Sequence, residues 1–349
     1  MEKVVEYIKR QVEQKNLPGA AIHISYQGET LLHAAIGYRS LEPKIQPMTI
    51  DTVFDLASLT KVVATNPAVL KLIDEGELML HDPVSRYLSE FAKNGKEEIK
   101  IRHLLTHTSG LTAHRPYYLD CQSREEVLAK IYEETPVEKI GEKVIYSDLG
   151  FILLSKVIEV ISGMKFEKFV QNNIFQPLEM LETGFNLPFA KERFAVTEKS
   201  RFTNKFKAGT VHDDNAEAMG GVSGHAGLFA TLADLEKFAA MIENDGVYFG
   251  KRILSKSVLQ LAKNNFTYFD TNEYRGLGWQ LKGPQYAPCG DLFSPKAFGH
   301  TGYTGTSIWF DPEINLHVIF LTNRVHIENK QEILSIRPKL HNLIRASLL

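Results

Sequence analysis

Apolar positions near the start of the chain change from helical spacing to strand-like runs. Over residues 4–16 the apolar side chains fall on one stripe, which predicts an amphipathic helix that ends before Pro18. Residues 20–26 and 31–38 flank a turn at Gln27-Gly28, so we expect a β-hairpin directly after this helix.

Helical spacing dominates the middle of the chain, and strand-like segments return towards its end. The predicted helices cover residues 54–75, 101–105, 124–134, 149–161, 166–174, 235–244 and 255–262. A short strand-like run precedes Tyr146, at residues 143–145. β-branched and aromatic residues then predict strands over 274–281, 297–302, 306–311 and 316–323, followed by a last amphipathic helix over about 330–347.

Strands at both ends of the chain with helices between them predict an α+β fold. The terminal segments are expected to form one antiparallel sheet flanked by the first and last helices, with the helical middle inserted. We therefore expect a discontinuous sheet domain of residues 1–61 and 236–349, and a mostly helical domain of residues 62–235. A ligand cleft is expected at the junction of the two domains.

The composition and charge of the chain mainly exclude classes of partner. The 349 residues carry a formal net charge of −2, which predicts no nucleic-acid partner and no anionic membrane surface. We find no secretory signal and no apolar stretch long enough to span a bilayer, so a cytoplasmic location is expected. Cys121 and Cys289 are expected to be free buried thiols. The sequence does not indicate an oligomeric state.

The first candidate for chemistry is the run Ser58-Leu59-Thr60-Lys61. On a helix, residues three positions apart share one face, so one turn can hold a nucleophile and its activator. A serine hydroxyl needs a base beside it at neutral pH, and a lysine amine can serve if its environment lowers its pKa. Such a run is common by chance, and a solvated helix face is the simpler interpretation.

Two further segments strengthen this hypothesis. Tyr146-Ser147-Asp148 precedes a predicted helix, with Asp148 placed to be its N-cap and Tyr146 placed to reach a cleft. His300-Thr301-Gly302 ends one predicted strand, where a glycine lets a substrate backbone approach closely.

Together these three motifs resemble the serine β-lactamase and penicillin-binding-protein superfamily, in its class C and esterase-like branch. The runs Ile101–Leu111 and Gly220–Leu228 are also similar to segments typical of that superfamily, and the resemblance extends from about Pro18 to Asn323. The resemblance implies a β-lactamase/transpeptidase-like fold with its active site between the sheet and the helical insertion.

Two residues depart from the family pattern. His300 stands where penicillin-binding proteins usually have lysine, and Asp148 stands where asparagine is usual. Both departures disfavour penicillin-like substrates. In these positions the chain is more similar to the esterase, amidase and D-aminopeptidase-like members of the family. The Gly220–Leu228 run is most similar to members that act on peptidoglycan fragments, including N-acetylmuramoyl-L-alanine amidases.

The resemblance implies a serine hydrolase that works through an acyl-enzyme on ester or amide bonds. Ser58 would be the nucleophile, and Lys61 and Tyr146 would share the proton transfers, with the identity of the base left open. The backbone N–H groups of Ser58 and Tyr303 would form the oxyanion hole. No metal or organic cofactor is expected. The expected substrate-binding residues are Asp148, His300, Thr301, Gly302 and His225.

Several alternatives remain at this point. A class C-like β-lactamase and a broad carboxylesterase use the same residues, and a penicillin-binding or sensor protein would acylate without turnover. His103 and His107 have the spacing of a zinc-binding helix but lack the intervening glutamate, so a structural role is expected. Residues 114–118 and 266–274 are candidate walls of the acyl-binding site because they are aromatic and lie beside turns.

Overall fold

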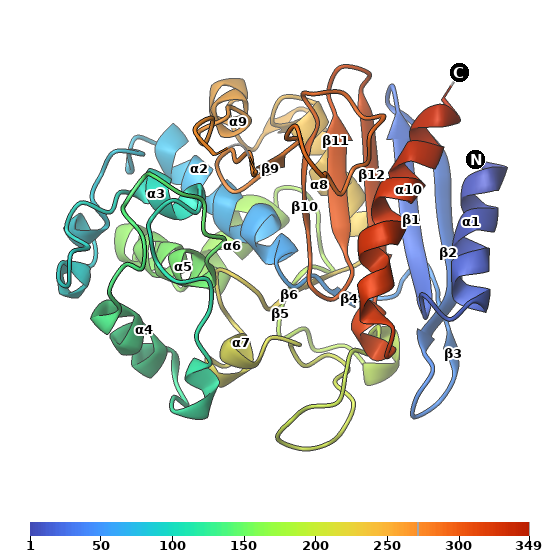
Figure 1. Ribbon diagram of the computed structural model, residues 1–349, viewed down its shortest axis with the longest axis horizontal. Coiled ribbons are helices and arrows are strands. Elements are labelled where there is room, and N and C mark those ends of the chain that lie inside the picture. The colour runs from blue at the N-terminus through green and yellow to red at the C-terminus, as the bar shows by residue number, and fades with distance from the viewer. Residues whose placement is uncertain (271, 349) are drawn as a thin grey trace.

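The computed structural model describes residues 1–270 and 272–348, and within them seven strands form one antiparallel sheet (Figure 1). The sheet joins the two ends of the chain, because β1 pairs with β12 from Ala20↔Thr322 to Tyr26↔Leu316. In spatial order the strands are β3 (Gln46–Pro47), β2 (Glu29–Ser40), β1 (Gly19–Tyr26), β12 (Leu316–Thr322), β11 (Ser307–Asp311), β10 (Phe298–Thr301) and β9 (Gln280–Leu281).

Both faces of this sheet are covered by helices. Successive side chains of a strand point to opposite faces, so Ile22 and Ile24 of β1 pack against α1 (Glu2–Glu13) and α10 (Ile333–Ala346). The two terminal helices lie on that face, at the right of Figure 1. The opposite face packs against α8 (Leu232–Glu243). The predicted α+β arrangement, with a sheet flanked by the terminal helices, is confirmed.

The rest of the chain is mostly helical and lies beside the sheet (Figure 1). Its α-helices are α2 (Asn66–Asp74), α3 (Ile101–Leu105), α4 (Arg124–Glu133), α5 (Asp148–Ser162), α6 (Phe166–Val170), α7 (Asp214–Ala218) and α9 (Lys256–Ala262). Two π-helical turns, η1 (Lys61–Thr65) and η5 (Gln171–Phe175), and six short 3₁₀ turns complete the described helices. The 3₁₀ turns are η2 (Val84–Arg86), η3 (Ser89–Phe91), η4 (Tyr117–Leu119), η6 (Lys191–Arg193), η7 (Arg324–His326) and η8 (Lys330–Glu332).

Short strands outside the main sheet form two smaller sheets. One consists of β4 (Phe54–Asp55), β6 (Leu228–Ala230) and β5 (Gly184–Phe185), and the other of β7 (Val247–Tyr248) and β8 (Lys251–Arg252). Among the described residues, no helix is both long enough and apolar enough to cross a membrane. Cys121 and Cys289 are free and buried, as predicted.

The structure corrects three predicted elements. Residues 54 and 55 are not helical, because β4 pairs with β6 and the Asp55 carboxylate accepts the backbone N–H of Ala57, so the helix begins only after that turn. Only Gln280 and Leu281 of the predicted strand 274–281 pair with β10, since Gly278 has a φ of +74° that breaks the extended backbone. Residues 143–145 form no strand.

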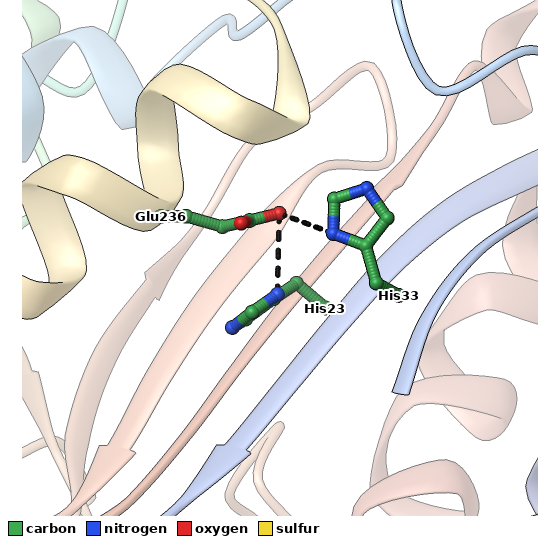
Figure 2. A group of neighbouring side chains, drawn as sticks. All are labelled: His23, His33 and Glu236. Atoms are coloured by element: carbon green, nitrogen blue, oxygen red, sulfur yellow. Dashed lines mark ion pairs between the residues drawn. The ribbon is translucent and has the colours of Figure 1, made fainter. Parts of the chain in front are cut away.

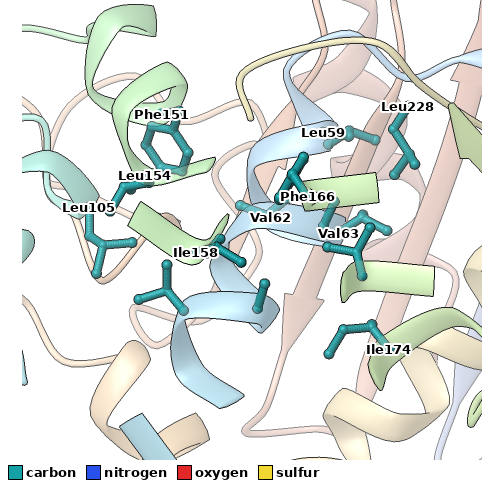
Figure 3. Close-up of a cluster of buried hydrophobic side chains, with 14 of the residues drawn as sticks. Leu59, Val62, Val63, Leu105, Phe151, Leu154, Ile158, Phe166, Ile174 and Leu228 are labelled. Carbon is teal, nitrogen blue, oxygen red and sulfur yellow. The ribbon is translucent and has the colours of Figure 1, made fainter. Parts of the chain in front are cut away.

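The helical part holds the segment after Ser58 rigidly. Leu59, Val62 and Val63 are fully buried and pack into a cluster supplied mainly by α3, α5 and the α6–η5 segment (Figure 3). The other labelled members of this cluster are Leu105, Phe151, Leu154, Ile158, Phe166, Ile174 and Leu228. Because protein interiors are packed as densely as organic crystals, this cluster fixes the position of the residues next to Ser58.

Candidate active site

Ser58 lies on a tight turn between β4 and the helical segment that contains η1 and α2. The preceding Ala57 has a φ of +46°, in the left-handed region that residues other than glycine rarely adopt. The Asp55 carboxylate stabilises this turn by accepting the backbone N–H groups of Ala57, at 2.8 Å, and of His212, at 2.6 Å. Strained backbone of this kind is concentrated at functional sites.

The Lys61 ammonium makes three hydrogen bonds at this turn. Its Nζ donates to Ser58 Oγ at 2.9 Å, to Asp148 Oδ1 at 2.8 Å and to the backbone carbonyl of His225 at 3.2 Å. Lys61 is fully buried, and its ammonium has three N–H donors, so all of them are used. The Ser58–Lys61 pairing predicted from one helical turn is therefore present, although that turn lies at the start of a π-helix.

Asp148 pairs with Lys61 instead of capping α5, which corrects the prediction for this residue. Ser147 occupies the N-cap and Asp148 is the first residue of the helix. Burial alone would raise the pKa of Asp148, but the Lys61 ammonium outweighs it and holds that pKa well below its usual range. Burial would likewise lower the pKa of Lys61, but the Asp148 carboxylate, assisted by the neighbouring Tyr146, outweighs it and raises that pKa. The pair is therefore ionised at neutral pH.

The Tyr146 ring lies among cationic and imidazole groups. Lys61 Nζ is 4.8 Å from the ring centroid, and Arg275 Cζ is 5.1 Å from it. The imidazole rings of His107 and His300 lie 4.4 Å and 5.8 Å from the phenol ring, centroid to centroid. The Tyr146 hydroxyl is buried and has no hydrogen-bond partner among the described residues. The phenol is thus held from several sides while its oxygen is left available.

Both imidazoles beside Tyr146 are neutral. Burial, reinforced by the positive charge of Arg275, lowers the pKa of His107 and of His300 well below the usual range of histidine. His107 Nδ1 accepts the backbone N–H of Ser147 at 3.0 Å, and His300 Nδ1 lies 2.9 Å from the Thr301 carbonyl, to which it donates. His300 therefore supplies no fixed positive charge at the position where penicillin-binding proteins usually carry lysine.

The turn after β10 is tied to the turn that carries Ser58. Thr304 Oγ1 donates to the Asp55 carbonyl at 2.7 Å, and Thr306 Oγ1 donates to the Leu56 carbonyl at 3.1 Å. A Cβ at Gly302 would lie 2.5 Å from the Leu56 carbonyl oxygen, so only glycine fits this close approach.

The backbone N–H groups of Ser58 and Tyr303 are both free to donate. Within the described ranges, neither N–H makes a hydrogen bond to the protein. The ties from Thr304 and Thr306 join the two segments that carry these N–H groups, and their role as an oxyanion hole stays a prediction.

A cavity of about 410 Å³ opens at Ser58. Of the predicted site residues, five line it: Ser58, Tyr146, Asp148, His225 and Tyr303. Its other lining residues are Ala57, His114, Tyr118, Glu198, Arg201, His212, Asp213, Asp214 and Ala226. Residues 114–118 thus contribute to the wall, whereas the segment 266–274 does not among its described residues, and Thr271 lies outside them.

Four predicted residues are not part of the cavity lining. Lys61 is buried behind Ser58, and His300 lies behind Tyr146. Thr301 and Gly302 lie at the end of β10, beside the cavity. That His300, Thr301 and Gly302 contact a substrate stays a prediction.

His225 and Asp213 form a second polar pair in the cavity wall. His225 Nε2 lies 3.0 Å from Asp213 Oδ1, and His225 Nδ1 lies 2.7 Å from Ser223 Oγ. Asp148, Asp213 and His225 each offer one ligand atom within 4.8 Å of the others. Asp148 already pairs with Lys61, and Asp213 already pairs with His225, so the group belongs to the candidate active site and gives no separate evidence for a metal.

Three residues of the candidate site are not predicted from the sequence: Asp213, Arg275, and His107 as a support of Tyr146. Asp213 could have been noticed, because it lies in the run of polar residues that precedes the glycine-rich segment. Arg275 carried no signal, since its side chain reaches Tyr146 only through the folded chain.

The family model described as Beta-lactamase matches residues 4–337. A relative from Escherichia coli O157:H7, named "Putative D-alanyl-D-alanine carboxypeptidase", is 32% identical over 361 residues, covering 92% of this chain and 81% of the relative. A protein of the same name from Salmonella agona is 34% identical over 310 residues, covering 80% of this chain and 71% of the relative.

Two solved structures share the fold. A penicillin-binding protein homologue from Pyrococcus abyssi, described as octameric, has a TM-score of 0.78 at 24% identity, covering 99% of this chain and 77% of the homologue. EstCE1, described as a hydrolase with promiscuous acyltransferase activity, also has a TM-score of 0.78, at 21% identity, covering 97% of this chain and 98% of EstCE1. At these identities the likeness shows the fold alone.

Proposed function

This chain belongs to the beta-lactamase family and is a serine hydrolase of that family, and on this basis we propose that it cleaves amide bonds in small peptide-like substrates, including peptidoglycan fragments. The proposal rests above all on the hydrogen bond of 2.9 Å between Lys61 Nζ and Ser58 Oγ at the floor of a cavity. Ser58, Lys61 and Tyr146 are proposed as the catalytic residues.

Acylation is proposed to begin with attack of Ser58 Oγ on the carbonyl carbon of the substrate. An O–C bond forms, the C–N bond of the amide breaks, and the serine proton ends on the leaving amine. Water then attacks the resulting ester, which releases the acid and regenerates Ser58. The free N–H groups of Ser58 and Tyr303 would bind the developing oxyanion.

We assign the transfer of the Ser58 proton to the Tyr146 hydroxyl, which accepts it while passing its own proton to the leaving amine, so that Tyr146 stays neutral. All three N–H groups of Lys61 already donate hydrogen bonds, and its raised pKa keeps it an ammonium, so it has no lone pair for another proton. The Tyr146 oxygen has no hydrogen-bond partner among the described residues, and Lys61 Nζ lies 4.8 Å from the centroid of the Tyr146 ring. In this assignment Lys61 acts through its positive charge and through its hydrogen bond to Ser58.

The charge of the cavity supports a peptide-like substrate over a penicillin. The wall presents the carboxylates of Asp148, Asp213, Asp214 and Glu198, and Arg201 is its one lysine or arginine among the described residues. Carboxylates accept hydrogen bonds from amide, amine and hydroxyl groups and repel a substrate carboxylate. Because His300 is neutral, the carboxylate of a β-lactam finds no fixed cation there. The name of the curated relatives points to D-amino-acid peptides.

We propose a division into a sheet domain of residues 1–61 and 236–349 and a helical domain of residues 62–235, with α9 of the first domain packed against α2 of the second. The position of the catalytic residues supports it. Ser58 lies on the turn that follows β4, Tyr146 lies on the loop that precedes α5, and Tyr303 lies on the turn that follows β10. The cavity is therefore assembled from the terminal and the middle parts of the chain.

Replacing Asp148 with asparagine is expected to shift the alkaline limb of the pH profile to lower pH. The Asp148 carboxylate raises the pKa of Lys61, so the variant loses the Lys61 proton at lower pH than the wild type. Because Lys61 acts as an ammonium in this assignment, kcat/KM then begins to fall at a lower pH, while the acid limb stays in place. The measurement is kcat/KM for a p-nitrophenyl ester from about pH 5 to about pH 11. A downward shift of the acid limb instead would identify Lys61 as the base.

Turnover of three substrate types tests the proposed function. We expect hydrolysis of a muramoyl-peptide or a D-alanyl-D-alanine peptide, measurable hydrolysis of a p-nitrophenyl ester, and weak or absent hydrolysis of nitrocefin. Fast nitrocefin turnover would contradict the argument from His300 and support a β-lactamase. A burst of p-nitrophenol without steady turnover of any substrate would instead indicate a sensor that acylates once. Steady ester turnover with no peptide cleavage would indicate a carboxylesterase.

A further inference from the structure

Three neighbouring strands of the main sheet each carry a histidine on the face that α8 covers. His23 of β1 is paired directly across the ladder with His33 of β2, and His317 lies on β12, on the other side of β1. The alternation of strand side chains explains this placement, since Ile22 and Ile24 point to the opposite face, towards α1 and α10. The rings of His23 and His317 are stacked, with centroids 5.2 Å apart and an interplanar angle of 19°.

Helix α8 adds a carboxylate to this group. Glu236 Oε1 lies 3.1 Å from Nδ1 of His23 and 2.8 Å from Nδ1 of His33, as Figure 2 shows. Two helical turns further on, Glu243 Oε2 lies 2.8 Å from Nδ1 of His317. His23 and His317 are 4% and 3% exposed, whereas the His33 side chain is 32% exposed.

The three atoms of His23, His33 and Glu236 converge without hydrogen bonding to one another. Despite the short distances, His23 Nδ1 and Glu236 Oε1 are buried and have no hydrogen-bond partner among the described residues. The two imidazole nitrogens and the carboxylate oxygen lie within 4.8 Å of one another. The ligand atoms of a tetrahedral zinc site are each about 2.0–2.2 Å from the ion, so they approach one another to little more than 3 Å.

We propose that His23, His33 and Glu236 bind a divalent transition-metal ion of the zinc class. Two imidazoles and one carboxylate form a known three-ligand set for zinc and leave a fourth position for water. A cavity of about 580 Å³ lies beside the group and is lined by His23, Glu236 and His317, so a fourth ligand has room. The stacked His317, paired with Glu243, holds the His23 ring in place.

This site is separate from the hydrolytic one. Its cavity shares no lining residue with the cavity at Ser58. Since its ligands come from β1, β2 and α8, a bound ion clamps the N-terminal hairpin to the helix on the sheet face. The inference does not depend on the proposed function. The sequence did not predict it, because the two histidines lie on different strands and Glu236 is remote from both in the chain.

Metal binding is tested with the full chain after treatment with a chelator and its removal. We expect isothermal titration with Zn²⁺ to give one ion per chain, and Co²⁺ to give the absorption of a tetrahedral complex. Zn²⁺ in excess is expected to raise the melting temperature by several degrees, because the ion binds the folded state. His33→Ala and Glu236→Gln are each expected to weaken binding at least about tenfold, since each removes one of the three protein ligands.

Matched controls separate this site from the alternatives. The exposed His81 lies outside the group, so His81→Ala should bind Zn²⁺ as the wild type does. The metal-free His33→Ala variant is expected to hydrolyse the ester as fast as the wild type does, which would show that the variant is folded. Binding that persists in both His33→Ala and Glu236→Gln, or that is lost in Asp213→Asn instead, would overturn the proposal. A dissociation constant for Zn²⁺ of a millimolar or weaker would also overturn the proposal. His23, His33 and Glu236 would then be an ion-pair cluster without a metal.

Discussion

Ser58→Ala is expected to lower kcat/KM for a p-nitrophenyl ester by at least about 10³-fold, because Ser58 is the only serine, threonine or cysteine among the described residues that line the cavity. The hydroxyl accepts a hydrogen bond from Lys61 Nζ at 2.9 Å and lies on a turn held by the Asp55 carboxylate. Removing one oxygen leaves that turn and its buried neighbours in place. The variant should therefore melt close to the wild-type temperature while its turnover is lost.

The control for this prediction is Ser89→Ala, which removes the hydroxyl of an exposed serine in η3. That variant should hydrolyse the ester like the wild type. Unchanged turnover of every ester and amide by Ser58→Ala would show that Ser58 is not the nucleophile. A loss of turnover together with a large fall in melting temperature would have to be resolved with Ser58→Cys, which keeps a nucleophilic atom at the position.

Lys61→Met is expected to lower kcat/KM by about 10²–10⁴-fold, the usual contribution of a group that assists proton transfer. Methionine is close to lysine in length, so the packing of η1 against α5 is largely kept. The change removes the donor to Ser58 and the positive charge beside Tyr146. It also removes the Lys61 partner of the Asp148 carboxylate, whose side chain is 18% exposed, and leaves only His114 Nδ1, 3.7 Å from Asp148 Oδ2.

The loss of the Lys61–Asp148 ion pair is expected to lower stability as well as activity, and the two effects can be separated. Breaking a buried ion pair by removing one partner typically costs about 3–5 kcal/mol, and the partial exposure of Asp148 places the expected loss of stability at or below the lower end. The double variant Lys61→Met/Asp148→Asn removes the stranded charge. Its free energy of unfolding, measured by urea denaturation, should return most of the way to the wild-type value. Its activity should stay as low as that of Lys61→Met. Recovery of activity in the double variant would contradict a catalytic role for Lys61.

Local spacing predicted much of the fold, because short-range patterns determine individual elements. The predicted hairpin corresponds to β1 and β2, and the predicted helix over residues 124–134 corresponds to α4. The predictions failed where tertiary pairing overrode local preference. Residues 54 and 55 have the apolar spacing of a helix, but they pair with β6, about 175 residues later in the chain, as the register Phe54↔Ala230 shows. No local pattern contains that partner.

In the candidate site, too, local contacts could be predicted from the sequence and contacts between distant segments could not. Ser58 and Lys61 could be paired from sequence because three positions on a helix define a contact. Asp148 was assigned to the N-cap, a local role, whereas its carboxylate binds an ammonium from a distant segment. Arg275 and Asp213 join the site only through the folding of loops that carry no periodic signal. The His23, His33 and Glu236 group is a further contact of this kind.

The central claim, an acyl-enzyme on Ser58, is tested most directly by mass spectrometry of the intact chain. The chain is mixed with a p-nitrophenyl ester, quenched in acid during turnover, and digested to locate the adduct. We predict one acyl group per chain, carried by the peptide that contains Ser58 and absent from Ser58→Ala. An acyl group on another residue, or steady turnover with no trapped adduct at any quench time, would contradict the account.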